Sequence, residues 1–448
     1  MIRWSVLLVA AAATAAFAGD PSSSTPAAAA TSRWILANVH VFDPLAGRMS
    51  DPTDIVIDGD RIVSVGSATR ETGVPVVDGE GRYAVPGLFD CHTHLAELTL
   101  ESEDSMRAAL RAFVERGITQ VRDVGGPLDR LARLRERIDS GDLLGPDLFY
   151  AGPMLEGSPL TWGARNTKLP GFTVAVDSDV AADSLLDAIA AGGARGVKLF
   201  GHIDRPVFER LVDGARARGL PVAHDPGPPL FHRDPVDLSI DLGVATIEHG
   251  KAPWPVVLRD DLRAEHDSMM QAKPFAQMRA MAFAGRVAAL GDDSIVPDRV
   301  DAIAARMVQR GVFLCPTLQV FAAMAGDTSM APPIAAMVRG METVSRSMTA
   351  RMARGGVEIL VGQDGCDAAG TFAEMRELAR CGIPPVEILR GATIRPARLL
   401  GEEDRLGSIA PGRTANLLVV DADPLEEIGN LERTRLVVLS GRSIERGR

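Results

Sequence analysis

The chain has 448 residues, of which 46% are hydrophobic, enough for a large core and more than one domain. Its formal net charge of −11 and the scatter of its basic residues exclude an extended nucleic-acid-binding surface. Its four cysteines (Cys91, Cys315, Cys366 and Cys381) are too few for a disulfide scaffold. We expect buried thiols, with a single disulfide as the alternative.

The first 32 residues are typical of an export signal followed by a linker. Arg3 precedes an apolar run over residues 4–16, and Ala16-Phe17-Ala18 fits a small-residue cleavage site. We therefore expect a signal peptide at residues 1–18 and a periplasmic or secreted mature protein without stable membrane insertion. An uncleaved membrane anchor is the alternative. Residues 19–32 are rich in Pro, Ser, Thr and Ala, which predicts a disordered linker.

Short β-strands are predicted near both ends of the chain. The runs concerned are residues 34–41, 54–65, 417–420 and 435–439. They are apolar or alternating and are bounded by turn residues, as half-buried antiparallel strands are. We predict that residues 33–84 and 401–448 pair into one small composite domain, a β-sandwich.

Residues 85–400 alternate between β-rich runs and amphipathic stretches. The predicted strands are residues 87–94, 118–124, 147–151, 196–200, 221–224, 245–249, 312–316 and 357–364. The predicted helices between them include residues 105–116, 128–138, 181–191, 206–218 and 298–310. Eight such units predict an α/β fold with a parallel sheet, most simply a closed (β/α)8 TIM barrel.

The first barrel strand carries two histidines separated by one residue. Side chains alternate across a strand, so His92 and His94 point to the same side and can offer two imidazoles to one ion. Imidazole suits zinc and related divalent metals. Taken alone, the pair is equally consistent with two hydrogen-bonded structural histidines.

Further polar residues lie at the ends of other predicted strands. They are Lys198, His224, His249 and Asp364, in the fourth, fifth, sixth and eighth strands. Barrel enzymes place their chemistry at the carboxyl ends of the strands, so these side chains are expected to converge with the two histidines. Only four of the 48 basic residues are lysines, which makes a lysine at this position noteworthy.

With these residues, the chain resembles the amidohydrolase superfamily, in particular its imidazolonepropionase-like and Xaa-Pro dipeptidase-like branch. The resemblance extends over residues 34–444. It rests on residues 86–95, 117–126, 196–198, 247–250, 392–393, 407–413, 415–417 and 421–424. It implies a (β/α)8 barrel, the composite β domain and metal-dependent hydrolysis of a C–N amide bond.

The resemblance also implies a role for each candidate residue. His92 and His94 would bind one divalent ion, and His224 and His249 a second, most simply both Zn²⁺. Lys198, carboxylated on its amine, would bridge the two ions. Asp364 would contact the first ion and carry a proton from a metal-bridging hydroxide to the leaving amine. A carbamate fits this role because an ammonium group cannot ligate a cation.

Loops after the strands depart from the family pattern and leave the substrate open. Gln363 precedes Asp364 where Thr or Ser is common, and His224-Asp225-Pro226-Gly227 is unusual. The expected substrate is a small molecule, a dipeptide or an N-acyl amino acid. The alternatives are a mononuclear cyclic-amide hydrolase or deaminase with a structural Lys198, and an exported binding protein without activity. A homo-oligomer is possible.

Overall fold

A computed structural model describes residues 33–67, 72–227, 236–271 and 277–445. The expected signal peptide and linker lie outside the described residues. Among the described helices, none combines the length and the hydropathy that a membrane span requires. All four cysteines are free; Cys91 and Cys315 are buried, and Cys366 and Cys381 are partly exposed.

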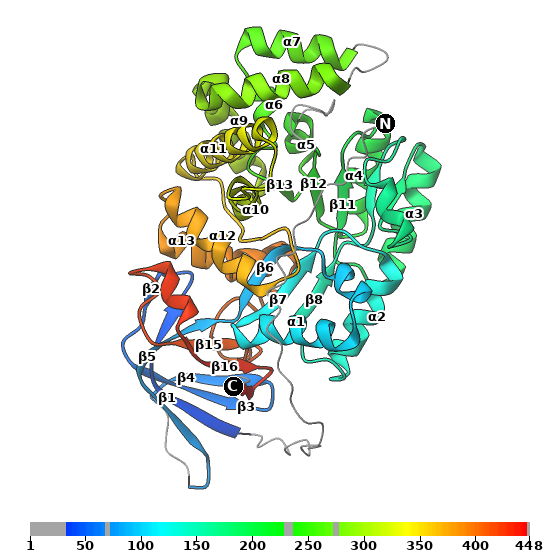
Figure 1. Cartoon of the computed structure of the whole chain (residues 1–448). Coiled ribbons are helices and arrows are strands. Elements are labelled where there is room, and N and C mark those ends of the chain that lie inside the picture. Colours follow the sequence, from blue (N-terminus) through cyan, green and yellow to red (C-terminus); the bar gives the residue numbers. More distant parts are fainter. Residues whose placement is uncertain (1–32, 68–71, 228–235, 272–276, 446–448) are drawn as a thin grey trace. The chain divides into compact units, whose positions relative to one another are not determined.

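Strands from both ends of the described chain form one eight-stranded sheet (Figure 1). Its strands are β1 (Arg33–Asp43), β2 (Arg48–Met49), β3 (Thr53–Asp58), β4 (Arg61–Gly66), β5 (Val76–Pro86), β15 (Leu417–Val420), β16 (Thr434–Leu439) and β17 (Arg442–Ile444). The order is β17-β16-β15-β5-β1-β3-β4, with β2 paired to β1. Strand β5 runs parallel to β1 and antiparallel to β15, so the predicted pairing of the two ends is confirmed.

This sheet folds over its own apolar core instead of forming two separate sheets. Ile62 of β4 exchanges two backbone hydrogen bonds with residues 412–413, donating to Arg413 (2.9 Å) and accepting from Gly412 (2.8 Å). Alternate residues of the strands, including Leu36, Ile55 and Leu417, are buried in the enclosed core. The intervening residues Ile35, Ala37 and Val56 are buried in a second cluster, so β1 and β3 are covered on both faces there.

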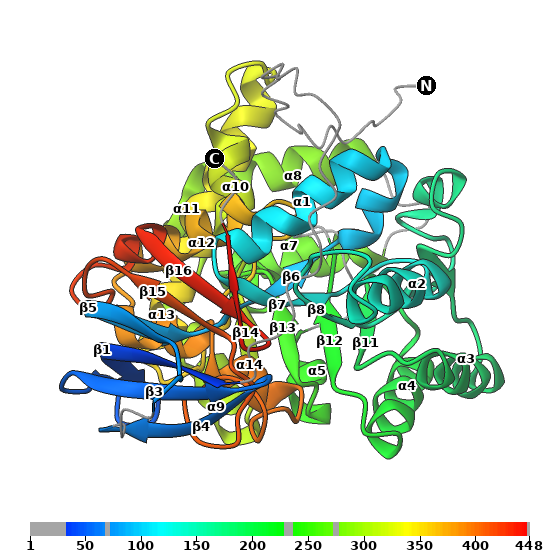
Figure 2. The same ribbon diagram turned by 90° about the horizontal axis from the view of Figure 1, so that it is seen from below.

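Parallel strands and surrounding helices make up the middle of the chain (Figure 2). Seven of the eight predicted strands are present: β6 (Leu88–Thr93), β7 (Ile118–Asp123), β8 (Asp147–Tyr150), β11 (Val197–Phe200), β12 (Val222–Asp225), β13 (Thr246–Glu248) and β14 (Phe313–Cys315). Two three-residue strands, β9 (Met154–Glu156) and β10 (Thr173–Ala175), were not predicted. The strands form two parallel sheets, β6-β7-β8 and β10-β9-β11-β12-β13-β14.

The predicted eighth strand, residues 357–364, makes backbone bonds to both sheets without forming a regular ladder. Leu360 donates to Leu314 of β14 (2.8 Å), and Cys91 of β6 donates to Val361 (2.8 Å). On the opposite side no ladder joins β8 to β11 among the described residues, although Arg195 donates to Tyr150 (2.8 Å). The strand order and direction are those of a TIM barrel with an accompanying sheet domain.

Helices follow the barrel strands. The predicted ones are α1 (Glu103–Glu115), α2 (Leu128–Asp139), α3 (Asp179–Ala191), α4 (Arg205–Ala217) and α9 (Pro297–Arg310). The others are α5 (Val236–Leu242), α6 (Trp254–Val257), α7 (Asp260–Gln271), α8 (Gln277–Leu290), α10 (Leu318–Ala325), α11 (Pro332–Arg354), α12 (Ala368–Arg380), α13 (Pro385–Gly391) and α14 (Ile394–Leu399). Short 3₁₀ helices are η1 (Leu95–Leu100), η2 (Gly163–Thr167), η3 (Gly291–Ser294) and η4 (Ile428–Glu432).

Candidate metal centre

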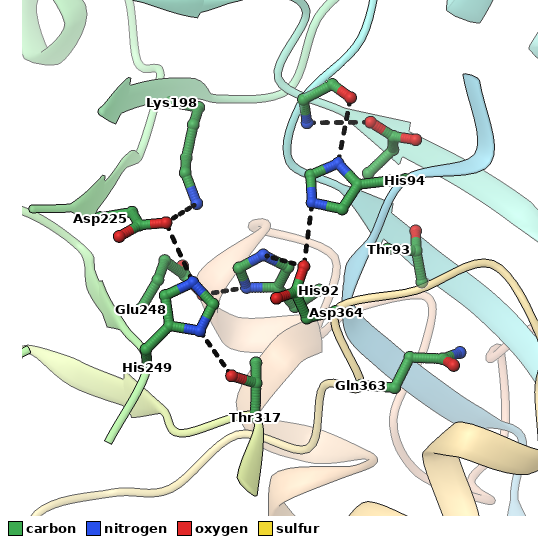
Figure 3. Close-up of polar contacts among 12 residues, drawn as sticks. His92, Thr93, His94, Lys198, Asp225, Glu248, His249, Thr317, Gln363 and Asp364 are labelled. Carbon is green, nitrogen blue, oxygen red and sulfur yellow. Dashed lines mark hydrogen bonds and ion pairs between the residues drawn. The ribbon is translucent and has the colours of Figure 1, made fainter. Parts of the chain in front are cut away.

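Polar side chains from five strand ends meet in one cluster (Figure 3). His92 lies on β6 and Lys198 on β11, each 1% exposed, and His249 follows β13. His94 and Asp364 also lie there. The cluster therefore contains five of the six predicted ligands. Carboxyl ends of parallel strands share one edge of a sheet, which explains the convergence of residues so distant in sequence.

The first part of the cluster consists of His92, His94 and Asp364. The Oδ1 atom of Asp364 lies 3.5 Å from Nε2 of His92 and 3.2 Å from Nε2 of His94. Bonds of about 2.0–2.1 Å to a tetrahedral ion place ligand atoms about 3.3 Å apart. The two distances from Asp364 therefore match the spacing of ligand atoms around such an ion, while the three ligand atoms that all lie within 4.8 Å of one another are those of His92, His249 and Asp364. We refer to His92, His94 and Asp364 as the β6 half-site.

Hydrogen bonds to the far nitrogens orient both imidazoles of the β6 half-site. Nδ1 of His92 donates to Oε2 of Glu248 (2.8 Å), and Nδ1 of His94 donates to the carbonyl oxygen of Gly125 (3.1 Å). Each Nδ1 is thus bonded to a group outside the half-site and each Nε2 faces Asp364, which is the orientation that a metal ligand requires. Arg122 in turn holds Glu248 through an ion pair of 2.6 Å.

Asp90 and Gln363 hold the backbone around Asp364 against β6. Oδ1 of Asp90 accepts from the backbone of His92 (3.1 Å), and its Oδ2 accepts from Nε2 of Gln363 (2.9 Å). A Cβ on Gly370 would come within 2.1 Å of the Gln363 side chain, so the long glutamine needs a glycine opposite it. The unusual Gln363 thus has a structural role.

The second part of the cluster consists of Lys198, Asp225 and His249. Oδ2 of Asp225 lies 2.9 Å from Nε2 of His249 and 3.6 Å from Nζ of Lys198. Nδ1 of His249 lies 2.6 Å from the hydroxyl of Thr317. We refer to Lys198, Asp225 and His249 as the β12 half-site.

His224 is the one predicted ligand that the structure does not bring to the cluster. Its ring packs edge-on against Phe208 of α4, with centroids 5.0 Å apart, and its Nδ1 shares a hydrogen bond of 2.6 Å with Ser239 of α5. Its neighbour Asp225 reaches the cluster instead. The expectation for His224 assumed that the last residue of the predicted strand faces inward, whereas β12 extends one residue further.

The backbone is left-handed at a residue that follows β13, at one that follows β14, and at Asp364, the last residue of the predicted eighth strand. His249, Thr317 and Asp364 have φ angles of 70°, 48° and 61°. A non-glycine residue in this region costs on the order of 1–3 kcal/mol, and such strain gathers at functional sites. At His249 the turn lets two adjacent residues, Glu248 and His249, both enter the cluster.

The charges of the cluster are strongly coupled. Burial raises the pKa of Asp364, but His92, His94 and His249 more than offset it, so that the pKa lies well below its usual value. Burial lowers the pKa of His94, whereas the bond to Asp364 raises it, to about 9 overall. Burial and Lys198 lower the pKa of His92 to about 4. Asp364 is therefore ionised at neutral pH.

Lys251 is a buried cation beside the cluster. It is 7% exposed, and its Nζ lies 5.1 Å from the centroid of the Phe321 ring. Burial lowers its pKa, against the attraction of Asp225 and Asp364, and it forms no ion pair within the described part of the chain. Arg165, a further cation that lies over the Phe172 ring, is paired with Glu97.

Sequence reasoning assigned no site role to Asp225, Glu248 or Thr317. Glu248 was part of a recognised motif, and Asp225 stood in a segment noted as unusual, so both could have been suspected. Thr317 carries no signal in the sequence because its role depends on the backbone turn after β14.

Comparisons with known proteins agree with this architecture. Residues 262–444 match the amidohydrolase family. A dihydroorotase of Streptomyces coelicolor is 28% identical over 238 residues, which are 48% of this chain and 48% of that protein. The chain thus aligns with about half the length of this relative. An imidazolonepropionase of Rubrobacter xylanophilus is 24% identical over 407 residues, covering 85% of this chain and 88% of that protein.

The fold is also found among solved structures. A Xaa-Pro dipeptidase with methionine bound in its active site has a TM-score of 0.69 and 20% identity, covering 92% of this chain and all of that chain. Enzymes of this superfamily hydrolyse C–N bonds and typically use divalent metals. Residues 262–444 thus match the amidohydrolase family, and the fold and the cluster of strand-end ligands agree with the amidohydrolase superfamily.

Proposed function

We propose that the protein is a metal-dependent hydrolase of an amide C–N bond in a dipeptide or N-acyl amino acid. The carrying observation is the β6 half-site, in which two oriented imidazoles face one carboxylate oxygen at 3.5 and 3.2 Å. His249 extends it, because ligand atoms of His92, His249 and Asp364 all lie within 4.8 Å of one another.

The residues of the cluster suit hydrolysis. A divalent ion held by these imidazoles and carboxylates lowers the pKa of water and polarises a carbonyl group. Asp364 is ionised and its side chain is 24% exposed, so it can accept a proton from the attacking water. The same carboxyl then donates the proton to the departing amine, as general base and afterwards as general acid.

Lys251 supports a substrate that carries a carboxylate. A buried ammonium without an anionic partner is costly, and an anionic ligand removes this cost. Dipeptides and N-acyl amino acids both carry a free carboxylate on the amino acid whose nitrogen forms the scissile amide. Lys251 follows His249 by two residues, so we place the substrate carboxylate near the β12 half-site.

A mononuclear cyclic-amide hydrolase or deaminase is the second candidate. The observation that favours it is the contact between Lys198 and Asp225, because an ammonium paired with a carboxylate has no need to be carboxylated. In this alternative Lys198 is structural and one ion is bound by the β6 half-site.

Substrate screening with metal analysis tests the proposal. Zinc-loaded protein is incubated with dipeptides, N-acyl amino acids and cyclic amides, and released amines and ammonia are measured beside a chelator-treated sample. We expect metal-dependent amine release from the first two classes. No hydrolysis of any amide by metal-loaded protein would refute the proposal. A ¹³C signal of a lysine carbamate after exposure to labelled bicarbonate would favour two ions, and its absence one.

A further inference from the structure

Two adjacent residues of β12 are candidates to face the cluster, and the strand register separates them. Strand β12 pairs in parallel with β11, so that Lys198 lies beside Ala223, Leu199 beside His224 and Phe200 beside Asp225. Neighbours in register point to the same face of a sheet. Lys198 points into the cluster, and Leu199 is part of the core between sheet and helices. Asp225 therefore shares the face of Lys198, and His224 the opposite face.

The surroundings of His224 agree with an outward position. His224 contacts Phe208 and Ser239, which belong to α4 and α5, the helices that follow β11 and β12. The residue is completely buried there. A rotation of the imidazole into the cluster would require β12 to shift by one residue, which would turn its apolar neighbours Val222 and Ala223 to the wrong faces.

The surroundings of Asp225 are those of a ligand. It is 5% exposed, and its Oδ1 accepts from the backbone of Gly227 (2.8 Å), which fixes the carboxylate plane. The other oxygen, Oδ2, is directed at Nε2 of His249 and Nζ of Lys198 (Figure 3). A metal-ligating carboxylate commonly has one oxygen fixed by a hydrogen bond while the other faces the metal. Asp225 has this arrangement.

We propose that Asp225, and not His224, joins His249 in binding a second divalent cation. This inference rests on the proposed metal-dependent function and changes its ligand set. An oxygen anion replaces the neutral imidazole that the family resemblance assigns to this strand. The β12 half-site then offers mixed nitrogen and oxygen ligands with a negative charge, a set that suits Zn²⁺, Co²⁺ and Mn²⁺.

Cobalt spectroscopy of cysteine variants distinguishes the two residues directly. Asp225→Cys and His224→Cys are each loaded with Co²⁺ and compared with the Co²⁺-loaded wild type, which contains the same four native cysteines. A thiolate bound to Co²⁺ gives an intense near-ultraviolet charge-transfer band. We expect the new band for Asp225→Cys and none for His224→Cys. A band for His224→Cys, or none for a folded Asp225→Cys, would overturn the inference.

Metal counting provides a second measurement if a cysteine variant does not fold. Wild type, Asp225→Asn and His224→Gln are dialysed against limiting Zn²⁺ and their metal content is determined. We expect two ions per chain in wild type and His224→Gln, and about one in Asp225→Asn. If the metal content of Asp225→Asn is unchanged and wild type still hydrolyses amides, the inference about Asp225 is contradicted but the proposed function is not. Wild type that binds no metal contradicts both the inference and the proposed function.

Discussion

The β6 and β12 half-sites lie side by side but are held in different ways. In the β6 half-site each imidazole has its own acceptor, Glu248 or the Gly125 carbonyl, and both rings face one carboxylate. In the β12 half-site the ligands contact each other, because Asp225 bonds to His249 and pairs with Lys198. Both half-sites must exchange a histidine–carboxylate contact for metal bonds, but the second must also give up the ion pair between Lys198 and Asp225. We expect the first to bind an ion more tightly.

The largest effect is expected from Asp364→Asn. The amide cannot accept a proton, so turnover should fall about 10²- to 10⁴-fold. His92 and His94 remain, and most of the metal should be retained. Turnover and metal content of the variant and of wild type check this. Near-normal turnover would show that the proton acceptor lies outside the β6 half-site.

Glu248→Gln should weaken the β6 half-site by releasing the His92 ring. Loss of an outer hydrogen bond to a ligand typically lowers metal affinity about 10- to 100-fold. The change also leaves the buried Arg122 without its anion, which costs about 3–5 kcal/mol of stability. Chelator competition measures the affinity, and urea unfolding the stability.

Glu377→Gln is the matched control for that variant. Glu377 on α12 is also buried and is paired with Arg346 and Arg380, away from the cluster. It should lose stability without losing metal affinity. An equal loss of affinity in both variants would show that stability alone controls metal binding.

Lys251→Met should act on substrate binding next to the β12 half-site. A hydrogen bond to a charged group contributes about 1.5–3 kcal/mol, so KM for a carboxylate-bearing substrate should rise about 10- to 100-fold with kcat little changed. Steady-state kinetics test this, with the exposed Lys168→Met as the control. An equal KM for wild type and variant would exclude Lys251 from substrate binding.

The last prediction concerns stability and not activity, at Glu374, a buried carboxyl that accepts a hydrogen bond from the backbone of Gln319. Burial raises its pKa to about 8, and its Oε1 has no hydrogen-bond partner. The folded protein thus holds a proton that the unfolded chain releases, so this group makes stability fall as pH rises, by about 1.4 kcal/mol per unit between about 4.5 and 8. Glu374→Gln should flatten this decline in urea unfolding. An unchanged slope would contradict the assignment.

The same two half-sites show what the sequence could predict. His92 and His94 are two residues apart, so they share a face of the strand whichever face that is. Their spacing alone was therefore sufficient to predict that they point to the same side. For β12 the phase decides between His224 and Asp225, and residues 222–225 are all buried. A parallel strand buried on both faces has no alternation of apolar and polar residues to reveal its phase. That choice required the register with β11.

Long helices and strands could be predicted from the sequence more accurately than short ones. The amphipathic helices α1, α2, α3, α4 and α9 were placed within two residues of their ends, since several turns show the helical period. Strands β9 and β10 have three residues each, too few to display any period. The segment of residues 357–364 has the composition of a strand, but the turn that aims Asp364 follows from tertiary contacts.

The position of β5 in its sheet has a consequence for how the protein folds. β5 is flanked by β1, which precedes it, and by β15, which is synthesised more than three hundred residues later. Until β15 arrives, one edge of β5 lacks its partner, and an unpaired edge invites pairing with other chains. The same strand leads directly into β6, where Gly87 bonds to Asn416 (2.8 Å). Strand β6, which carries His92 of the proposed metal site, is therefore secured only after β15 has been synthesised, which favours slow folding.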